Sequence, residues 1–501
     1  MQVNKVGEQN LFRLLGHFSL LVLLSGASLH SSSFEDFKKA QNTSFSIYTD
    51  ERDHAFKNHL EAQWKEFKAQ KSIPLYEKPK PQNIISTVAK PIKSVGPKIS
   101  VFIAKKQKNE TVKKKKIMKK EVIKIDIKPK ITIEEVIAIK KDVNFDFYGT
   151  QIGLNIDPNI KNALYYPQNQ KGISNFFDTL ASSEYEYLVT KIEEISTDLE
   201  LNDWGKYLLV TMLSRELFDS KDNVNLFNWF IFNKLGYRVK VGVLNRHIVV
   251  MYHSKKIIYA TPSYKFSGEK YYVLTNYIEE RLGSLYSYEH NYPDADKSLD
   301  LSLNQLPNFS KDMKNKKLLF KQFGKEYSVK YRYNQNLINF MSTYPQADYE
   351  TFFNTPLDEQ TYDDIAKDLK KHIDGLQASS AINFVLNFVQ NAFKYETDNK
   401  QFGREKVMFA QETLYFDNSD CEDRAILFSS LVKRIFKIGV IGVKYSDHMA
   451  TALYIPITGD SIKTNGRKFV IADPTYVNAN IGQSMPKYRS IQPESFIIVK
   501  N

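Results

Sequence analysis

The chain has 501 residues, a formal net charge of +13 and a single cysteine. Its length allows two or three domains, and an apolar share of 42% excludes a wholly disordered chain. One cysteine excludes a disulfide framework and any multi-cysteine metal site. Because no run of 18 apolar residues occurs in the sequence, a polytopic membrane protein is excluded as well.

Residues 1–27 have the composition of an export signal. Lys5 and Arg13 supply positive charge, a short apolar stretch covers 14–24, and the small residues Ser-Gly-Ala at 25–27 offer a cleavage site. The alternative is an uncleaved membrane anchor, although the apolar stretch is short for a spanning helix. Either interpretation predicts the periplasm or another compartment of the cell envelope.

Residues 28–75 form a charged segment with spaced aromatic side chains, a pattern that suits one or two short amphipathic helices. The stretch 34–67, which begins FEDFKKAQNTSF and ends EAQWKEF, resembles the N-terminal region of murein transglycosylase C, an envelope enzyme. The resemblance implies an envelope address. It is carried by the aromatic positions Phe34, Phe37, Phe45, Tyr48, Phe56, Trp64 and Phe67.

Residues 76–141 are rich in lysine and proline, and they hold the excess charge. From 78 to 141 there are 19 lysines and 5 acidic residues, which leaves 51 basic and 52 acidic residues elsewhere. Because proline favours extended backbone and like charges repel, we expect a stretched, disordered linker. It would act as a plain spacer or as a tether to an anionic envelope surface. Nucleic acid is not expected as a partner.

From residue 142 onward the apolar periodicity predicts globular α+β structure. We divide it into a domain at 142–310, a connecting hairpin (318–333) and helix (362–376) within 311–375, and a C-terminal domain at 376–501.

The only cysteine, Cys421, is expected at the first turn of a helix. Ser419 or Asp420 can cap that helix, and apolar residues at helical spacing follow from Ala425. The helix dipole and the unpaired N–H groups at such a position favour thiolate over thiol. The neighbouring acidic groups are expected to cap the helix or to pair with Arg424. A cysteine nucleophile needs this kind of environment.

A thiolate nucleophile also needs a base and a group that orients it. His448 opens a predicted strand, and Asp473 closes the strand-like run RKFVIAD that follows a glycine-containing loop. If the two strands pair in antiparallel fashion, His448 lies beside Asp473. Asp473 could then orient the imidazole toward Cys421.

The order Cys, His, Asp, with the motifs DCEDRA at Cys421, DHMATAL at His448 and ADPTY at Asp473, resembles the bacterial transglutaminase-like superfamily, which has a papain-like fold. The likeness covers about 144–501 and is greatest to large uncharacterised envelope members. It implies Cys421 as nucleophile, His448 as base and Asp473 as orienting residue. By the same resemblance Gln390, on a predicted helix at 381–393, is a candidate oxyanion donor. The alternative for Gln390 is bracing of the helix packing.

The middle region repeats the C-terminal pattern in degenerate form. Residues 218–242 align with 419–443, and a histidine and a Thr-Pro-Ser-Tyr motif follow. Ser220 then stands at the position of Cys421, His247 at that of His448, and Thr261 at that of Asp473. Since a serine–histidine pair without a carboxylate is a poor nucleophile, this copy is expected to be catalytically silent.

Two functions remain open on the sequence. The first is an exported thiol enzyme that forms a Cys421 thioester at an amide bond, with hydrolysis as a cysteine peptidase or amidase favoured over protein cross-linking. Its substrate would be a polypeptide or a peptidoglycan peptide. The second is a non-catalytic envelope binding or assembly protein on the same scaffold. No cofactor is expected, and one cysteine with scattered histidines does not make a zinc site.

Overall fold

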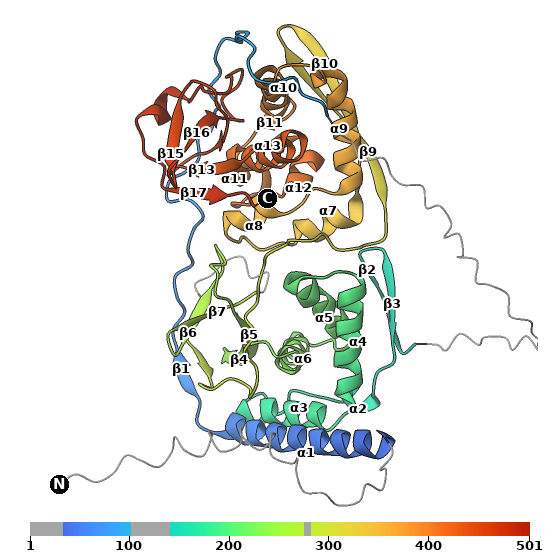
Figure 1. Ribbon diagram of the computed structural model, residues 1–501. Helices are drawn as coiled ribbons and strands as arrows, with labels where there is room; N and C mark the ends of the chain where they lie inside the picture. Colours follow the sequence, from blue (N-terminus) through green and yellow to red (C-terminus); the bar gives the residue numbers. More distant parts are fainter. Residues whose placement is uncertain (1–33, 102–140, 275–281, 501) are drawn as a thin grey trace, which may run out of the picture. The chain divides into compact units, whose positions relative to one another are not determined.

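The computed structural model describes residues 34–101, 141–274 and 282–500 (Figure 1). The chain divides into two compact units, Met1–Ala55 and Phe56–Asn501. Helix α1 (Phe34–Glu61) crosses the division, so the expected one or two short helices are one helix of 28 residues. The signal at 1–27 lies outside the described residues. Among the helices that are described, none has the length and apolar character needed to cross a membrane.

The middle region is an α+β fold in which helices precede an antiparallel sheet. Its sheet has the order β1-β8-β4-β5-β7-β6. The last helix, α6, is central to the core, because Trp229, Phe230 and Phe232 on it have no exposed surface. The elements are β2 (Val143–Phe147), β3 (Thr150–Leu154), α2 (Pro158–Lys161), α3 (Gln170–Ala181), α4 (Tyr185–Asp198), α5 (Asp203–Leu217), α6 (Lys221–Lys234), β4 (Val239–Leu244), β5 (His247–His253), β6 (Ser263–Phe266), β7 (Glu269–Tyr272) and β8 (Leu285–Ser287), with β1 (Lys65–Phe67) from the N-terminal side.

The connecting segment has the predicted hairpin and helix. Strands β9 (Met313–Gln322) and β10 (Lys325–Asn334) pair in antiparallel fashion. Phe323 and Gly324 make the tight turn between them, both with positive φ. Helix α9 (Glu359–Ile373) follows, after α7 (Gln335–Ser342) and α8 (Tyr349–Asn354). Asp358 caps α9 by accepting a hydrogen bond from the Thr361 N–H.

The C-terminal domain places helix α13 (Cys421–Phe436) before a five-stranded antiparallel sheet of order β15-β16-β14-β13-β17. The side chains of α13 from Ala425 to Val432 are buried except Ser430, as the helical apolar spacing predicted. The other elements are α10 (Ala378–Asn391), β11 (Lys394–Tyr395), α11 (Asp398–Phe402), α12 (Ala410–Tyr415), β12 (Asn418–Ser419), β13 (Val440–Lys444), β14 (Met449–Leu453), β15 (Ser461–Thr464), β16 (Arg467–Ala472), the 3-10 helix η1 (Pro486–Arg489) and β17 (Ser495–Ile498).

The two sheets share one topology. In chain order, the strands β4 to β8 lie in the order 3-4-2-1-5, and the strands β13 to β17 lie in that same order. All the neighbouring pairs are antiparallel, and one buried helix directly precedes each set. A five-strand order with the same strand directions is a specific arrangement, so the internal repeat expected from the sequence is present in the fold.

The register of the repeat is also preserved. Val239 pairs with Tyr252 in one sheet, as Val440 pairs with Leu453 in the other, and each residue stands 201 positions from its counterpart. Gly236 and Lys437, again 201 apart, both adopt positive φ after their helices. The same spacing relates Ser220 to Cys421 and His247 to His448.

The prediction of a disordered linker at 76–141 is wrong for residues 76–101. Residues 76–101 lie along the C-terminal domain in extended form and bond to it, and we call residues 75–101 the strap (Figure 1). Its backbone bonds reach Val477 from Ile85 and Thr87, and Leu376 from Ile99. Composition could not predict this, because the acceptors and counter-charges belong to distant parts of the chain. Residues 102–140 lie outside the described residues.

Candidate functional site

Helix α13 presents Cys421 at its first position. Asp420 and Asp423 form a capping box, in which the Asp420 N–H donates to Asp423 Oδ2 at 3.2 Å. This confirms that acidic residues cap the helix start. The other possibility, pairing with Arg424, is not seen among the described contacts: this buried guanidinium donates to Ser419 Oγ and to the backbone carbonyls of Gln390, in the last turn of α10, and Phe393, just after it. Arg424 therefore fastens α10 to α13 instead of neutralising the acids.

The antiparallel pairing of β14 with β16 brings His448 to Asp473, as predicted. Thr451 lies opposite Ala472 in the register, and His448 Nε2 is 2.9 Å from Asp473 Oδ2. The other carboxylate oxygen of Asp473 accepts the N–H groups of Thr475 and Tyr476 at 2.9 and 3.2 Å. Since both side chains are almost fully buried, Asp473 holds the imidazole in one orientation.

Tyr488 on η1 is part of this site, and no pattern in the sequence indicated it. Its ring stacks on the His448 ring with centroids 4.7 Å apart and an interplanar angle of 20°. Its hydroxyl donates to Asp447 Oδ1 at 3.1 Å. Burial, followed by the nearby charges of Asp447, Cys421 and Asp473, raises the pKa of Tyr488.

The environment of Cys421 differs from the expected one. The side chain has no exposed surface, and its Sγ donates to Glu422 Oε2 at 3.1 Å. Burial and the charges of Glu422 and Asp420 raise the pKa of the Cys421 thiol well above its usual range, and Lys80 opposes this only in part. The prediction of a thiolate stabilised by the helix start is therefore wrong for this state, because desolvation and adjacent carboxylates outweigh the helix dipole. Of the hydrogen bonds among the described residues, none joins Cys421 to His448.

Lys80, from the strap, lies at the centre of the acidic groups. Its buried Nζ is 2.5 Å from Asp420, 2.6 Å from Glu422, 2.8 Å from Asp398 and 2.8 Å from Glu405. Burial would lower the pKa of Lys80, but the carboxylates raise it well above its usual range. Burial raises the pKa of Asp398 to about 7 despite the contact with Lys80. The sequence placed Lys80 in a solvated linker and gave no indication of this role.

Three groups in this cluster have the spacing of metal ligands: Asp398, Glu405 and Glu422; Asp398, Asp420 and Asp423; and Asp420, Cys421 and Glu422. The Lys80 ammonium takes the central position among the carboxylates. These residues therefore do not fit a metal ion while the strap is bound.

Gln390 does not serve as an oxyanion donor in this arrangement. Its amide nitrogen donates to the carbonyls of Asp473 and Ala479 at 3.0 and 3.1 Å, and its oxygen accepts the Asn478 N–H at 3.1 Å. Both amide hydrogens are thus taken. Gln390 therefore braces the loop that follows Asp473, whereas the alternative expected from the sequence was bracing of the helix packing.

The middle copy lacks the complete arrangement. Ser220 is exposed, and His247, with a side chain 78% exposed, lies 3.5 Å from Asp222. The assignment of Thr261 to the position of Asp473 is wrong, because Thr261 precedes β6, whereas Asp473 follows β16. The strand that matches β16 is β7, and the apolar Val273 follows it. The carboxylate is missing in either register.

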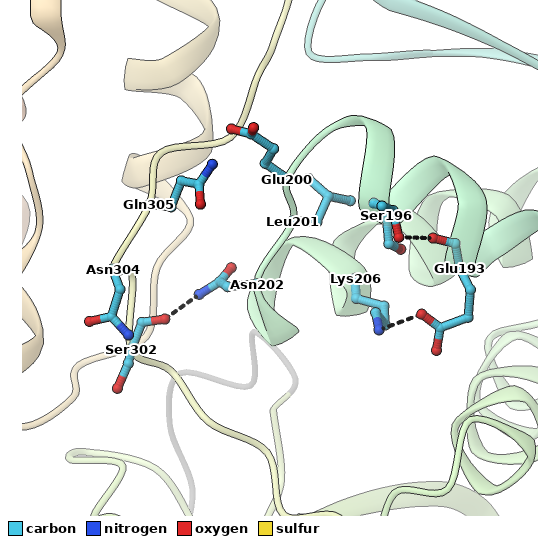
Figure 2. A pocket seen from close by; sticks show the side chains of 10 residues that line it. Glu193, Ser196, Glu200, Leu201, Asn202, Lys206, Ser302, Asn304 and Gln305 are labelled. Atoms are coloured by element: carbon cyan, nitrogen blue, oxygen red, sulfur yellow. Dashed lines mark hydrogen bonds and ion pairs between the residues drawn. The ribbon is translucent and has the colours of Figure 1, made fainter.

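A polar pocket of about 470 Å³ lies elsewhere in the middle region (Figure 2). Within it Asn202 donates to the Ser302 carbonyl at 3.1 Å, and Lys206 pairs with Glu193 at 3.0 Å. None of its lining residues belongs to the cysteine site, so the pocket is separate from that site.

The chain matches no protein-family model, and no curated protein and no solved structure is significantly similar to it.

Proposed function

We propose that this protein is a thiol acyl-transfer enzyme of transglutaminase-like type with a papain-like C-terminal domain. Cys421 is the nucleophile, His448 the base and Asp473 the orienting residue. The observation that carries the proposal is the buried 2.9 Å bond between His448 Nε2 and Asp473 Oδ2. A buried cysteine stands at the start of α13, a helix that packs against β14, the strand next to His448. Because Nε2 of His448 is bonded to Asp473, Nδ1 is the ring nitrogen that would accept the thiol proton.

In the proposed reaction the Cys421 sulfur attacks an amide carbonyl, and His448 takes the thiol proton and passes it to the departing amine. The acyl group stays on sulfur as a thioester. Water then gives hydrolysis, and a primary amine gives cross-linking. The backbone N–H of Cys421 is the available oxyanion donor, since Gln390 is occupied. Hydrolysis of an envelope polypeptide or peptidoglycan peptide is the favoured outcome, and the periplasm or cell envelope the proposed location.

A second candidate is a non-catalytic envelope binding or assembly protein. It is favoured by the raised pKa of the buried Cys421 thiol and by the hydrogen bond of the thiol to Glu422 instead of His448. An activity-based thiol probe, followed by identification of released or cross-linked envelope peptides, separates the two. The enzyme predicts labelling and product that are lost in Cys421→Ala. If neither the wild-type protein nor Cys421→Ala changes the envelope peptides, even after the strap has been loosened, the non-catalytic binding protein is favoured.

A further inference from the structure

The strap covers the only thiol of the protein. Tyr76 is buried, with its hydroxyl 4.0 Å from Cys421 Sγ and 3.3 Å from Glu422 Oε2. An amide carbonyl must come within about 3–3.5 Å of the sulfur to react. Because Tyr76 occupies this approach and Cys421 has no exposed surface, a substrate cannot reach the sulfur in this state.

Lys80 fixes the strap at this position. Its neighbours Lys78 and Pro79 are exposed, whereas Lys80 turns inward to Asp398, Asp420 and Glu422. The carboxylates need a cation, since buried acidic groups beside one another repel strongly. One Asp420 oxygen still has no hydrogen-bond partner although it is buried. The cluster of carboxylates around Lys80 is therefore a site for an ammonium group, and a lysine of the same chain occupies it.

Beyond Lys80 the strap is bound as an extended polypeptide. The Thr87 N–H donates to the Val477 carbonyl at 3.0 Å, and the Val95 N–H donates to Ser379 Oγ at 2.8 Å. Asn478 and Asn480 donate side-chain N–H groups to strap carbonyls at 3.2 and 2.9 Å. Because the prolines of the strap have no N–H to donate, the hydrogen bonds between the strap backbone and the domain are widely spaced. Widely spaced bonds of this kind favour local opening of a segment over unfolding of the whole domain.

We propose that the strap is an internal inhibitor: it occupies the groove of an extended polypeptide substrate, and its Lys80 fills the subsite for a primary ammonium group. A substrate that displaces the strap must bring its own cation to these carboxylates. The favoured substrate class is therefore a peptide with a lysine or another primary amine near the scissile amide. The substrate groove rests on the proposed function, whereas the covering of the thiol does not.

Variants of the full chain test the covering. Lys80→Met removes the cation, and Lys78→Met is the matched control on the exposed neighbour. Since breaking a buried ion pair is strongly destabilising, we expect hydrogen exchange of the Thr87 and Val95 amides to become ~100-fold faster in Lys80→Met. Cys421 should also react faster with iodoacetamide at alkaline pH. Lys78→Met should behave as wild type.

A second variant covers the case that Lys80→Met does not fold. Asn478→Gly with Asn480→Ala removes two strap bonds and leaves every buried charge paired; glycine suits the positive φ of Asn478. In this double variant too, hydrogen exchange of the strap amides and iodoacetamide labelling of Cys421 should become faster. Wild-type exchange and labelling in a folded Lys80→Met protein, or in this double variant, would overturn the inhibitor.

A peptide of residues 74–90 tests the ammonium subsite in trans. Added to the loosened double variant, it should slow Cys421 labelling, and a peptide with Lys80→Met should not. Equal effects of the two peptides would overturn the ammonium subsite. Faster labelling of the loosened variants without any turnover of amide substrates would instead reject the proposed enzyme, and with it the inhibitor, and leave only the covering of the thiol by the strap standing.

Discussion

At the scale of single residues, the site depends on one imidazole held between two groups. Asp473 fixes the ring by a hydrogen bond, and Tyr488 covers its face. In the proposed reaction, the carboxylate would set the tautomer and stabilise the imidazolium that forms on proton transfer. The ring of Tyr488 limits its rotation. The two neighbours therefore contribute in different ways and can be separated by substitution.

Asp473→Asn should leave the fold intact and lower turnover by ~10³-fold or more, since an amide cannot stabilise an imidazolium. The measurement is kcat on a peptide or amide substrate with the strap loosened. Asp417→Asn, an equal change at an exposed position, is the control and should keep wild-type kcat. A loss of less than about tenfold would show that Asp473 does not orient the base.

Tyr488→Ala should reduce kcat, because it frees the face of the His448 ring, whereas Tyr488→Phe keeps the stacking and loses only the bond to Asp447. We expect the phenylalanine variant to retain most of the activity. Measuring kcat and KM separately tests this, since a positioning role lowers kcat first. Equal losses in the two variants would assign the effect to the hydroxyl.

At the scale of elements, strand β4 carries a buried lysine, Lys240, whose charged form is destabilised by burial. Lys240 donates to the Glu289 carbonyl at 2.8 Å and lies among the rings of Phe266, Tyr271 and Tyr288. Desolvation lowers the pKa of Lys240 to about 7, against the opposing effect of Glu289 and Glu269. A lysine with a lower pKa in the folded state binds fewer protons there than in the unfolded chain. Its contribution to stability therefore rises with pH from about 7 toward the unfolded pKa near 10.5.

Lys240→Met should accordingly raise the free energy of unfolding at pH 7, on the order of a few kcal/mol, and flatten its dependence on pH above 7. Denaturant unfolding at several pH values measures both effects. Lys265→Met, on the exposed side of β6, should change neither. A destabilised Lys240→Met protein would mean that the bond to Glu289 and the ring contacts outweigh the cost of burial.

At the scale of the whole molecule, the fold consists of two related α+β regions, and only the C-terminal one has the proposed Cys–His–Asp residues. The strand orders and the register agree, so the difference lies in a few side chains. Cys421, His448 and Asp473 are buried, whereas Ser220 and His247 lie on the surface. The exposed pair lacks a carboxylate at the position of Asp473, and it lacks the desolvation that strengthens electrostatic interactions; the acidic neighbour of His247 is Asp222, at 3.5 Å.

Ser220→Ala combined with His247→Ala should therefore leave acyl transfer unchanged, whereas Cys421→Ala combined with His448→Ala should abolish it. Because each double variant alters matched positions of the repeat, they serve as controls for each other. Product formation from a peptide or amide substrate is the measurement. A clear loss of activity in the first variant would mean that the middle region takes part in the reaction.

The sequence by itself determined the α+β class, the repeat, the hairpin, the caps of α13 and the pairing of His448 with Asp473. These features depend on periodicity and on residues that are neighbours in sequence or in adjacent strands, where short-range geometry decides the outcome. Helix and strand periods are visible in a single sequence, so such elements can be found without tertiary information.

Only the tertiary structure decided the state of the thiol. Tyr76 and Lys80 come from a segment more than 300 positions away in the chain, and a lysine- and proline-rich composition is typical of solvated linkers. The burial of Cys421, the raised pKa of its thiol, the alternative role of Gln390 and the stacking of Tyr488 all depend on such distant contacts. Local sequence cannot predict desolvation, because it is set by whatever distant part of the chain packs over a group.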